Sequence, residues 1–171
     1  MFAQPLSYYG MLLGHLGMVV MMIGICCTVY YSVERDLRMA PGDEVELAGY
    51  QFKFIETRQI NGPNFVSDQA EISVTRNGQE IVALLPEKRL YSARGNVMTE
   101  ADIDPGLFRD LYVALGEPLT QSAWGVRIQT KPFVRWIWIG GLLSALGGII
   151  AICDKRYRRS RGKDYANFLK I

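Results

Sequence analysis

Two long apolar stretches lie near the two ends of the sequence, and both are long enough to cross a membrane as helices. Residues 11–29 and 136–152 contain no charged side chain, and about 20 predominantly apolar residues suffice for a membrane-spanning helix. Pro5 suits a first helical position, so we predict one helix from Leu6 to about Tyr31 and another between residues 132 and 153. Aromatic side chains flank both stretches, as at membrane interfaces: Tyr8, Tyr9, Tyr30, Tyr31, Trp136 and Trp138.

The charges around these stretches predict a topology. No basic segment precedes the first stretch and no small-residue cleavage site follows it, so we expect a retained helix and not a signal peptide. Residues 154–171 hold seven Lys or Arg against two Asp, which is typical of the cytoplasmic side. We therefore expect a first transmembrane segment in residues 1–33, an exported domain in 34–131, a second transmembrane segment in 132–153, and both termini in the cytoplasm.

Between the two stretches the pattern changes to short segments in which apolar and polar residues alternate. Residues 50–54, 72–75 and 124–128 alternate in this way, as half-buried strands do. Asn77-Gly78 is the strongest hairpin signal in this region. We therefore predict an integral membrane protein in which two transmembrane helices flank a mainly β exported domain, a small antiparallel barrel or sandwich.

Two parts of the predicted β domain are less regular. In residues 98–119 the alternation is weak, and we expect a short helix or a long loop there. The Pro-Glu-Lys-Arg segment at 86–89 is typical of a solvated strand edge and does not indicate a binding site.

Charge and composition exclude several functions. The segment from Glu34 to Arg135 carries twelve Lys/Arg and fifteen Asp/Glu, a net of −3, and it has no basic patch with interleaved aromatics, so nucleic acid is not an expected partner. It also lacks a His/Cys cluster, a Ser/His/Asp set and a phosphate-binding glycine loop. The three cysteines lie in or beside the predicted helices, where we interpret them as small apolar residues: Cys26, Cys27 and Cys153.

The single histidine, His15, lies inside the first apolar stretch. Ionisable residues within membrane helices are costly and are commonly functional. A neutral imidazole can instead form a hydrogen bond to a neighbouring helix and only pack there. These two interpretations remain open from the position of His15 alone.

The neighbours of His15 offer a site for either role. Helical spacing places a ridge of small residues beside it: Gly10, Gly14, Gly17 and Gly24. Three methionines fall on its own side: Met11, Met18 and Met22. Such a ridge admits a second helix, with Gly140, Ser144 and Gly148 as a matching small face, or a flat ligand. A neutral imidazole in an apolar, glycine-flanked site suits haem iron.

Several segments resemble one protein family. The segments "GMLLGHLGMVVMMIG", "GPNFVSDQAEISVTRNGQE", "MTEADIDPGLFRDLYVALGEP" and "WGVRIQTKPFVRWIWIGGLLSALGGIIAICDKRYR" are similar to the C-terminal part of the CcmF-type cytochrome c maturation proteins, the haem lyase component, and of their NrfE-type paralogues. The resemblance runs in order from about Gly10 to Arg158.

The resemblance implies a role in covalent attachment of haem to apocytochrome c at the bacterial inner membrane, with the central domain on the periplasmic side. Its implied partners are the remainder of the haem lyase, a haem chaperone, a thiol-handling maturation subunit and apocytochrome c. By its place in "LLGHLGM", His15 would be an axial ligand of a b-type haem, haem b, shared with the rest of the complex. The resemblance assigns no catalytic residue to the exported domain.

The family's tryptophan-rich segment, its exported histidine pair and its other transmembrane histidine have no counterpart here. We therefore expect one piece of a divided maturation protein, or a fragment, and no lyase activity from this chain alone. An alternative is a structural assembly subunit that binds apocytochrome or a thiol-redox partner without ligating haem. A third interpretation, an unrelated membrane-anchored sensor domain, disagrees with the order of the motifs.

Overall fold

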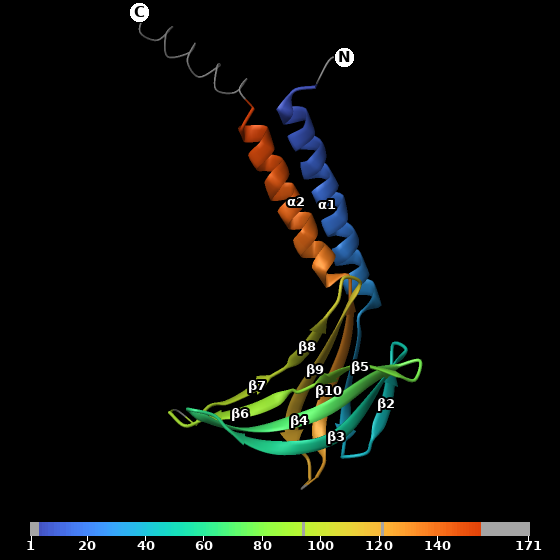
Figure 1. Cartoon of the computed structure of the whole chain (residues 1–171), viewed down its shortest axis with the longest axis vertical. Coiled ribbons are helices and arrows are strands. Elements are labelled where there is room, and N and C mark those ends of the chain that lie inside the picture. Colours follow the sequence, from blue (N-terminus) through green and yellow to red (C-terminus); the bar gives the residue numbers. More distant parts are fainter. Residues whose placement is uncertain (1–3, 94, 121, 155–171) are drawn as a thin grey trace, which may run out of the picture. The chain divides into compact units, whose positions relative to one another are not determined.

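The computed structural model describes residues 4–93, 95–120 and 122–154, which form two compact units (Figure 1). One unit is a pair of helices, from the described residues up to Cys26 and from Phe133 onward. The other is a β unit, Cys27–Pro132. The predicted basic tail lies outside the described residues from position 155 onward, so the topology drawn from it stays a prediction.

Both predicted helices are confirmed. Helix α1 spans Leu6–Tyr31 and helix α2 spans Val134–Ile152. Each is apolar on all sides, with an 18-residue window of mean hydropathy 2.1 in α1 and 1.6 in α2, so each is long and apolar enough to cross a membrane. Phe133, whose backbone is left-handed (φ 58°), precedes α2 and separates it from the last strand.

The two helices pack through glycines. The buried residues of α1 are Gly10, Gly17 and Gly24, and those of α2 are Gly140 and Gly147. A Cβ built on Gly10 would lie 2.6 Å from the carbonyl oxygen of Gly147, so only glycine permits this approach of the backbones. The predicted close packing of the small ridge is confirmed, with one correction. Gly148 was expected to lie in the helix contact, but nothing lies within 4 Å of a Cβ built on it. Gly147 lies in the contact instead.

The β unit is a sandwich of two antiparallel sheets, with the orders β1-β10-β9-β8 and β2-β3-β4-β6-β7, and β5 also pairs with β4. The first sheet consists of β1 (Val33–Met39), β8 (Asp102–Pro105), β9 (Arg109–Pro118) and β10 (Trp124–Pro132). The second consists of β2 (Glu44–Leu47), β3 (Tyr50–Asn61), β4 (Phe65–Arg76), β5 (Gln79–Leu84), β6 (Glu87–Tyr91) and β7 (Val97–Glu100). Figure 1 shows the strands of both sheets.

Alternating residues of both sheets form one core. The second sheet contributes alternating apolar residues of β3 and β4, and the first contributes those of β9 and β10. These side chains are almost completely buried: Phe52, Phe54, Ile72, Val74, Leu111, Val113, Leu115, Val126 and Ile128. The predicted hairpin at Asn77-Gly78 joins β4 to β5, with positive φ at both residues (52° and 76°), as a type I′ turn requires.

The structure corrects two predictions. Residues 98–119 form no helix or long loop but lie largely in β7, β8 and β9. Strands β7 and β8 have four residues each, too few to show alternation, and Ala114 on the outer face of β9 is buried like the core residues beside it. The segment 86–89 is not a strand edge, because β6 lies between β4 and β7. The Lys88 ammonium, on a side chain that is 10% exposed, donates a hydrogen bond to the Gly116 carbonyl (3.0 Å) and pairs with the Glu117 carboxylate (2.5 Å).

Candidate functional site

His15 lies on α1, one residue after Gly14, with its side chain on the exposed surface of the helix pair. Its ring nitrogen Nδ1 is 2.8 Å from the carbonyl oxygen of Met11, one helical turn earlier. A carbonyl oxygen only accepts hydrogen bonds, so Nδ1 carries the proton. In the neutral ring Nε2 is therefore unprotonated, which is the form in which histidine binds a metal, with its other nitrogen held by a backbone carbonyl.

A groove of about 280 Å³ lies beside His15 on the surface of the helix pair. Both helices line it: Gly10, Met11, Gly14, His15, Met18, Ser144, Gly147, Gly148 and Ala151. Gly14 and Gly148 have open space where a Cβ would be, so the two glycines leave the groove wide. The groove is largely apolar, with one imidazole at its side.

The glycines of the ridge thus have two uses. Gly10 and Gly17 are buried against α2, whereas Gly14 has free space where its Cβ would project. The hydroxyl of Ser144 donates to the Gly14 carbonyl oxygen at 3.2 Å, which ties the two helices together next to the groove. Of the three methionines expected on the His15 side, Met11 (48% exposed) and Met18 (49% exposed) line the groove, whereas Met22 is exposed (52%) but does not line it.

These residues suit one axial bond to a haem iron. Nε2 of the neutral imidazole is free, the groove is apolar, and glycines leave room for a flat ring beside the imidazole. The chain holds one histidine in all. In the part of the chain that the structure describes, no group of three or more His, Cys, Asp or Glu could hold a metal ion by itself.

Asp154 is a feature of the helix pair that sequence reasoning missed. It was counted only as a charge of the tail, yet it is 6% exposed and its Oδ2 accepts a hydrogen bond from the backbone N–H of Ser7 at 2.9 Å. That N–H is one of the unsatisfied donors in the first turn of α1, where a carboxylate is favourable. The 147 residues between the two partners explain why no local pattern indicated the contact.

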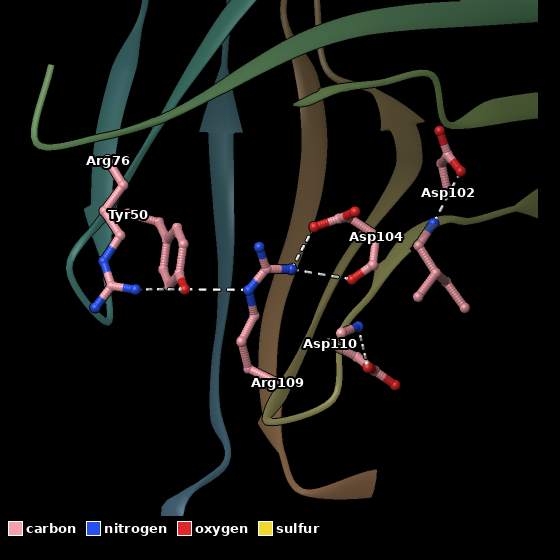
Figure 2. Close-up of polar contacts among 8 residues, drawn as sticks. Tyr50, Arg76, Asp102, Asp104, Arg109 and Asp110 are labelled. Atoms are coloured by element: carbon pink, nitrogen blue, oxygen red, sulfur yellow. Dashed lines mark hydrogen bonds and ion pairs between the residues drawn. The ribbon is translucent and has the colours of Figure 1, made fainter. Parts of the chain in front are cut away.

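A polar cluster at one end of the β unit joins its two sheets (Figure 2). The hydroxyl oxygen of Tyr50 on β3 accepts hydrogen bonds from Nη1 of Arg76 and from Nε of Arg109, both at 3.1 Å. Arg109 also forms an ion pair with Asp104. Burial alone would lower the pKa of Arg109, but hydrogen bonds to Asp104 and Tyr50 raise it.

A second polar cluster lies on the second sheet. Nε of Arg89 donates to Glu87 at 2.8 Å, and the Arg89 guanidinium lies 4.6 Å from the centre of the Phe65 ring. The hydrogen bond from Arg89 holds the pKa of Glu87 below its ordinary value. Both side chains are partly buried, with 28% of Arg89 and 15% of Glu87 exposed.

Comparisons with known proteins agree with this fold. The family described as the CcmF C-terminal beta-sandwich matches residues 30–132. A solved structure of the cytochrome c haem lyase CcmF has the same fold, with a TM-score of 0.66 at 18% identity, covering 84% of this chain and 24% of that chain.

Curated relatives match over almost the whole chain. The cytochrome c-type biogenesis protein CcmF of Pseudomonas aeruginosa is 59% identical over 152 residues, which are 89% of this chain and 23% of the relative. CcmF of Escherichia coli is 51% identical over 153 residues, 90% of this chain and 24% of the relative. NrfE of Haemophilus influenzae is 33% identical over 156 residues, 91% of this chain and 25% of the relative.

The chain thus spans about a quarter of the length of the curated relatives it matches. The family match itself covers more than half of the chain and includes the whole β sandwich. The chain therefore belongs to the CcmF family of cytochrome c-type biogenesis proteins.

Proposed function

We propose that this chain is the C-terminal module of a membrane haem lyase that attaches haem to apocytochrome c. In this proposal α1 and α2 cross the bacterial inner membrane within residues 1–33 and 132–153. Residues 34–131 lie on the periplasmic side, and both termini, including the basic residues 154–171, lie in the cytoplasm. Family membership and two sufficiently long apolar helices support it.

His15 would hold the iron of a b-type haem that is shared with the rest of the lyase. The observation that carries this proposal is the hydrogen bond from Nδ1 to the Met11 carbonyl, because it leaves Nε2 free to bind iron. A second histidine ligand would come from outside this chain, which has no other histidine. When bound, the haem would supply one-electron chemistry.

The residues around His15 have separate tasks in this proposal. The Met11 carbonyl holds the imidazole in one orientation and one tautomer. Gly14 and Gly148 leave space for the edge of a flat macrocycle. The side chains of Met11 and Met18 line the groove and lower its polarity, which would favour an apolar ring there.

The β unit positions the partners of the reaction: the haem chaperone, the thiol-handling subunit and apocytochrome c. A hollow of about 580 Å³ on β1, β9 and β10 supports this role. Its wall combines cationic, aromatic and aliphatic groups, among them Arg38, Arg127, Tyr112 and Leu119. Such a mixed surface suits a polypeptide partner. None of these residues has a catalytic task in the proposal.

The test is the reduced-minus-oxidised absorption spectrum of the assembled complex with His15→Ala. The matched control is Leu16→Ala, since Leu16 is the next residue, is 55% exposed and does not line the groove. We expect the b-type bands to disappear or shift in His15→Ala and to persist in Leu16→Ala. An unchanged spectrum in an assembled His15→Ala complex would instead support a structural subunit without a haem ligand.

A further inference from the structure

The turn between β8 and β9 presents two large apolar side chains at its tip. Leu107 is 52% exposed and Phe108 is 58% exposed. The turn is fixed on both sides: the N–H of Gly106 donates to Asp110 at 3.0 Å, and Arg109 pairs with Asp104. A Cβ on Gly106 would lie 2.5 Å from the Arg109 carbonyl oxygen, so the tight turn requires glycine there. Exposed apolar residues on so well held a turn indicate a contact surface.

This tip lies at the end of the β unit where the chain leads to both helices. Arg109 is in register with Pro132, the last residue of β10, and α2 begins at Val134. Pro132 is the last residue of the β unit, so the tip lies at the end of that unit from which the chain leaves for an apolar helix. The other connection is at the same end, because the Thr28 hydroxyl in the last turns of α1 donates to the Pro132 carbonyl at 2.7 Å.

Two arginine guanidinium groups lie beside the tip. Arg76 and Arg109 lie on either side of the Tyr50 hydroxyl, as Figure 2 shows. Asp104 neutralises Arg109, whereas exposed Arg76 forms no ion pair with the other residues that the structure describes. Lys131, next to Pro132, lies over the ring of Tyr112 at 5.7 Å.

We infer that the β8–β9 turn is a membrane anchor that inserts Leu107 and Phe108 into the lipid surface while Arg76 binds a lipid phosphate. Apolar side chains next to basic ones are the combination that holds interfacial segments in a bilayer, and guanidinium groups pair well with phosphate. The turn would hold the sandwich at a fixed height above the membrane. The inference rests on the membrane placement of the helices proposed above.

The inference is tested by measuring how deeply spin labels lie in the membrane, in the assembled complex reconstituted in lipid nanodiscs. Cys26, Cys27 and Cys153 are free and are first replaced by Ala. A label at Leu107→Cys is compared with one at Leu90→Cys, which is similarly exposed (49%). Leu90 lies on β6, and Lys88 of the same strand contacts Gly116 on β9. Gly116 is seven residues along β9 from Arg109, a distance of roughly 24 Å, so Leu90 lies far from the tip.

We expect the label at 107 to be more accessible to oxygen than to a water-soluble nickel reagent, and the label at 90 to show the reverse. Equal nickel accessibility at the two positions would overturn the inference. Protection of position 107 from both reagents would also overturn it, because protein and not lipid would then cover the turn. A third label at Leu142→Cys, in the middle of α2 and 66% exposed, separates the two proposals. If that label also lies in water, the membrane placement itself is wrong.

The phosphate contact is tested with Arg76→Gln in nanodiscs of zwitterionic lipid and of lipid with added phosphatidylglycerol. In the unaltered protein we expect the anionic lipid to increase the depth of the label at 107. Arg76→Gln should abolish this difference. If the difference persists in Arg76→Gln, Arg76 does not bind the lipid phosphate.

Discussion

A Cβ built on Gly17 would lie 2.6 Å from the carbonyl oxygen of Gly140, and one built on Gly140 would lie 2.6 Å from the carbonyl oxygen of Gly17. Gly10 and Gly147 have the same reciprocal relationship, also at 2.6 Å. Each pair is seven residues from the next along its helix, which is about two helical turns, so both contacts lie on one face. The helix pair therefore has two reciprocal glycine–glycine contacts, and the groove beside His15 lies along the same two helices.

Replacement of Gly17 by Ala should destabilise the helix pair. The added methyl would lie 2.5 Å from the backbone nitrogen of Ser144, so the helices must separate, at a cost of about 1–3 kcal/mol. The thermal midpoint of the purified complex measures this. Gly141→Ala is the matched control on α2, since nothing lies within 4 Å of a Cβ built there and Gly141 does not line the groove, and its midpoint should stay unchanged. Equal midpoints for Gly17→Ala and the unaltered complex would contradict this packing.

A larger side chain at position 148 should block the groove without separating the helices. Gly148→Phe places a ring in the groove beside His15, whereas Gly148→Ala adds one methyl. We expect the haem content of the assembled complex, measured by pyridine haemochrome, to fall strongly in Gly148→Phe and to stay near normal in Gly148→Ala. Full haem content in Gly148→Phe would show that the groove is not part of the haem site.

Removal of the Asp154 carboxylate should weaken the first turn of α1. Asp154→Ala leaves the Ser7 N–H without its acceptor, and loss of such a cap costs about 1 kcal/mol. Asp154→Asn keeps an acceptor oxygen without the charge and should lose less. Hydrogen exchange of the first turn measures the effect, with Cys153→Ala as the neighbouring control. Equal protection in Asp154→Ala and Cys153→Ala would mean that the hydrogen bond contributes nothing.

The Glu87–Arg89 pair makes the β unit sensitive to acid. The hydrogen bond from Arg89 lowers the pKa of Glu87 from its ordinary value of 4.5. A lowered pKa in the folded state stabilises the fold fully above about pH 4.5, and this contribution disappears as the pH falls through the folded-state pKa. Glu87→Gln should therefore lower stability at neutral pH and make unfolding less dependent on pH below 4.5. Glu46→Gln, on the exposed edge strand β2, should keep the full acid dependence.

The sequence predicts those elements in which one face alone is buried. Alternation from Tyr50 to Phe54 identifies β3 because its even-numbered side chains enter the core and its odd-numbered ones face water. Strand β9 shows no such pattern, since Ala114 is buried on the opposite face from Leu111 and Val113. The burial of Lys88 depends on a carbonyl in the other sheet, which no local pattern contains.

The residues of the candidate site could be predicted from the sequence, but the contacts between the two helices could not. Helical spacing places His15 beside the glycines of α1, and the structure places it in the groove they form with α2. Gly147, and not Gly148, pairs with α1 because of the register between two helices that lie more than 100 residues apart in the chain. Both residues are glycine, so the amino-acid type does not show which of them makes the contact. The cap of Ser7 by Asp154 depends on the same register.

The central claim, that Nε2 of His15 binds haem iron, is tested most directly by imidazole rescue of His15→Gly in the assembled complex. Glycine leaves a cavity of imidazole size at the edge of the groove. We expect His15→Gly to lose the reduced b-type bands and added imidazole to restore them, while imidazole leaves the unaltered complex unchanged. Normal bands in His15→Gly before any imidazole is added would contradict the claim, and His15 would then be a packing residue of the helix pair.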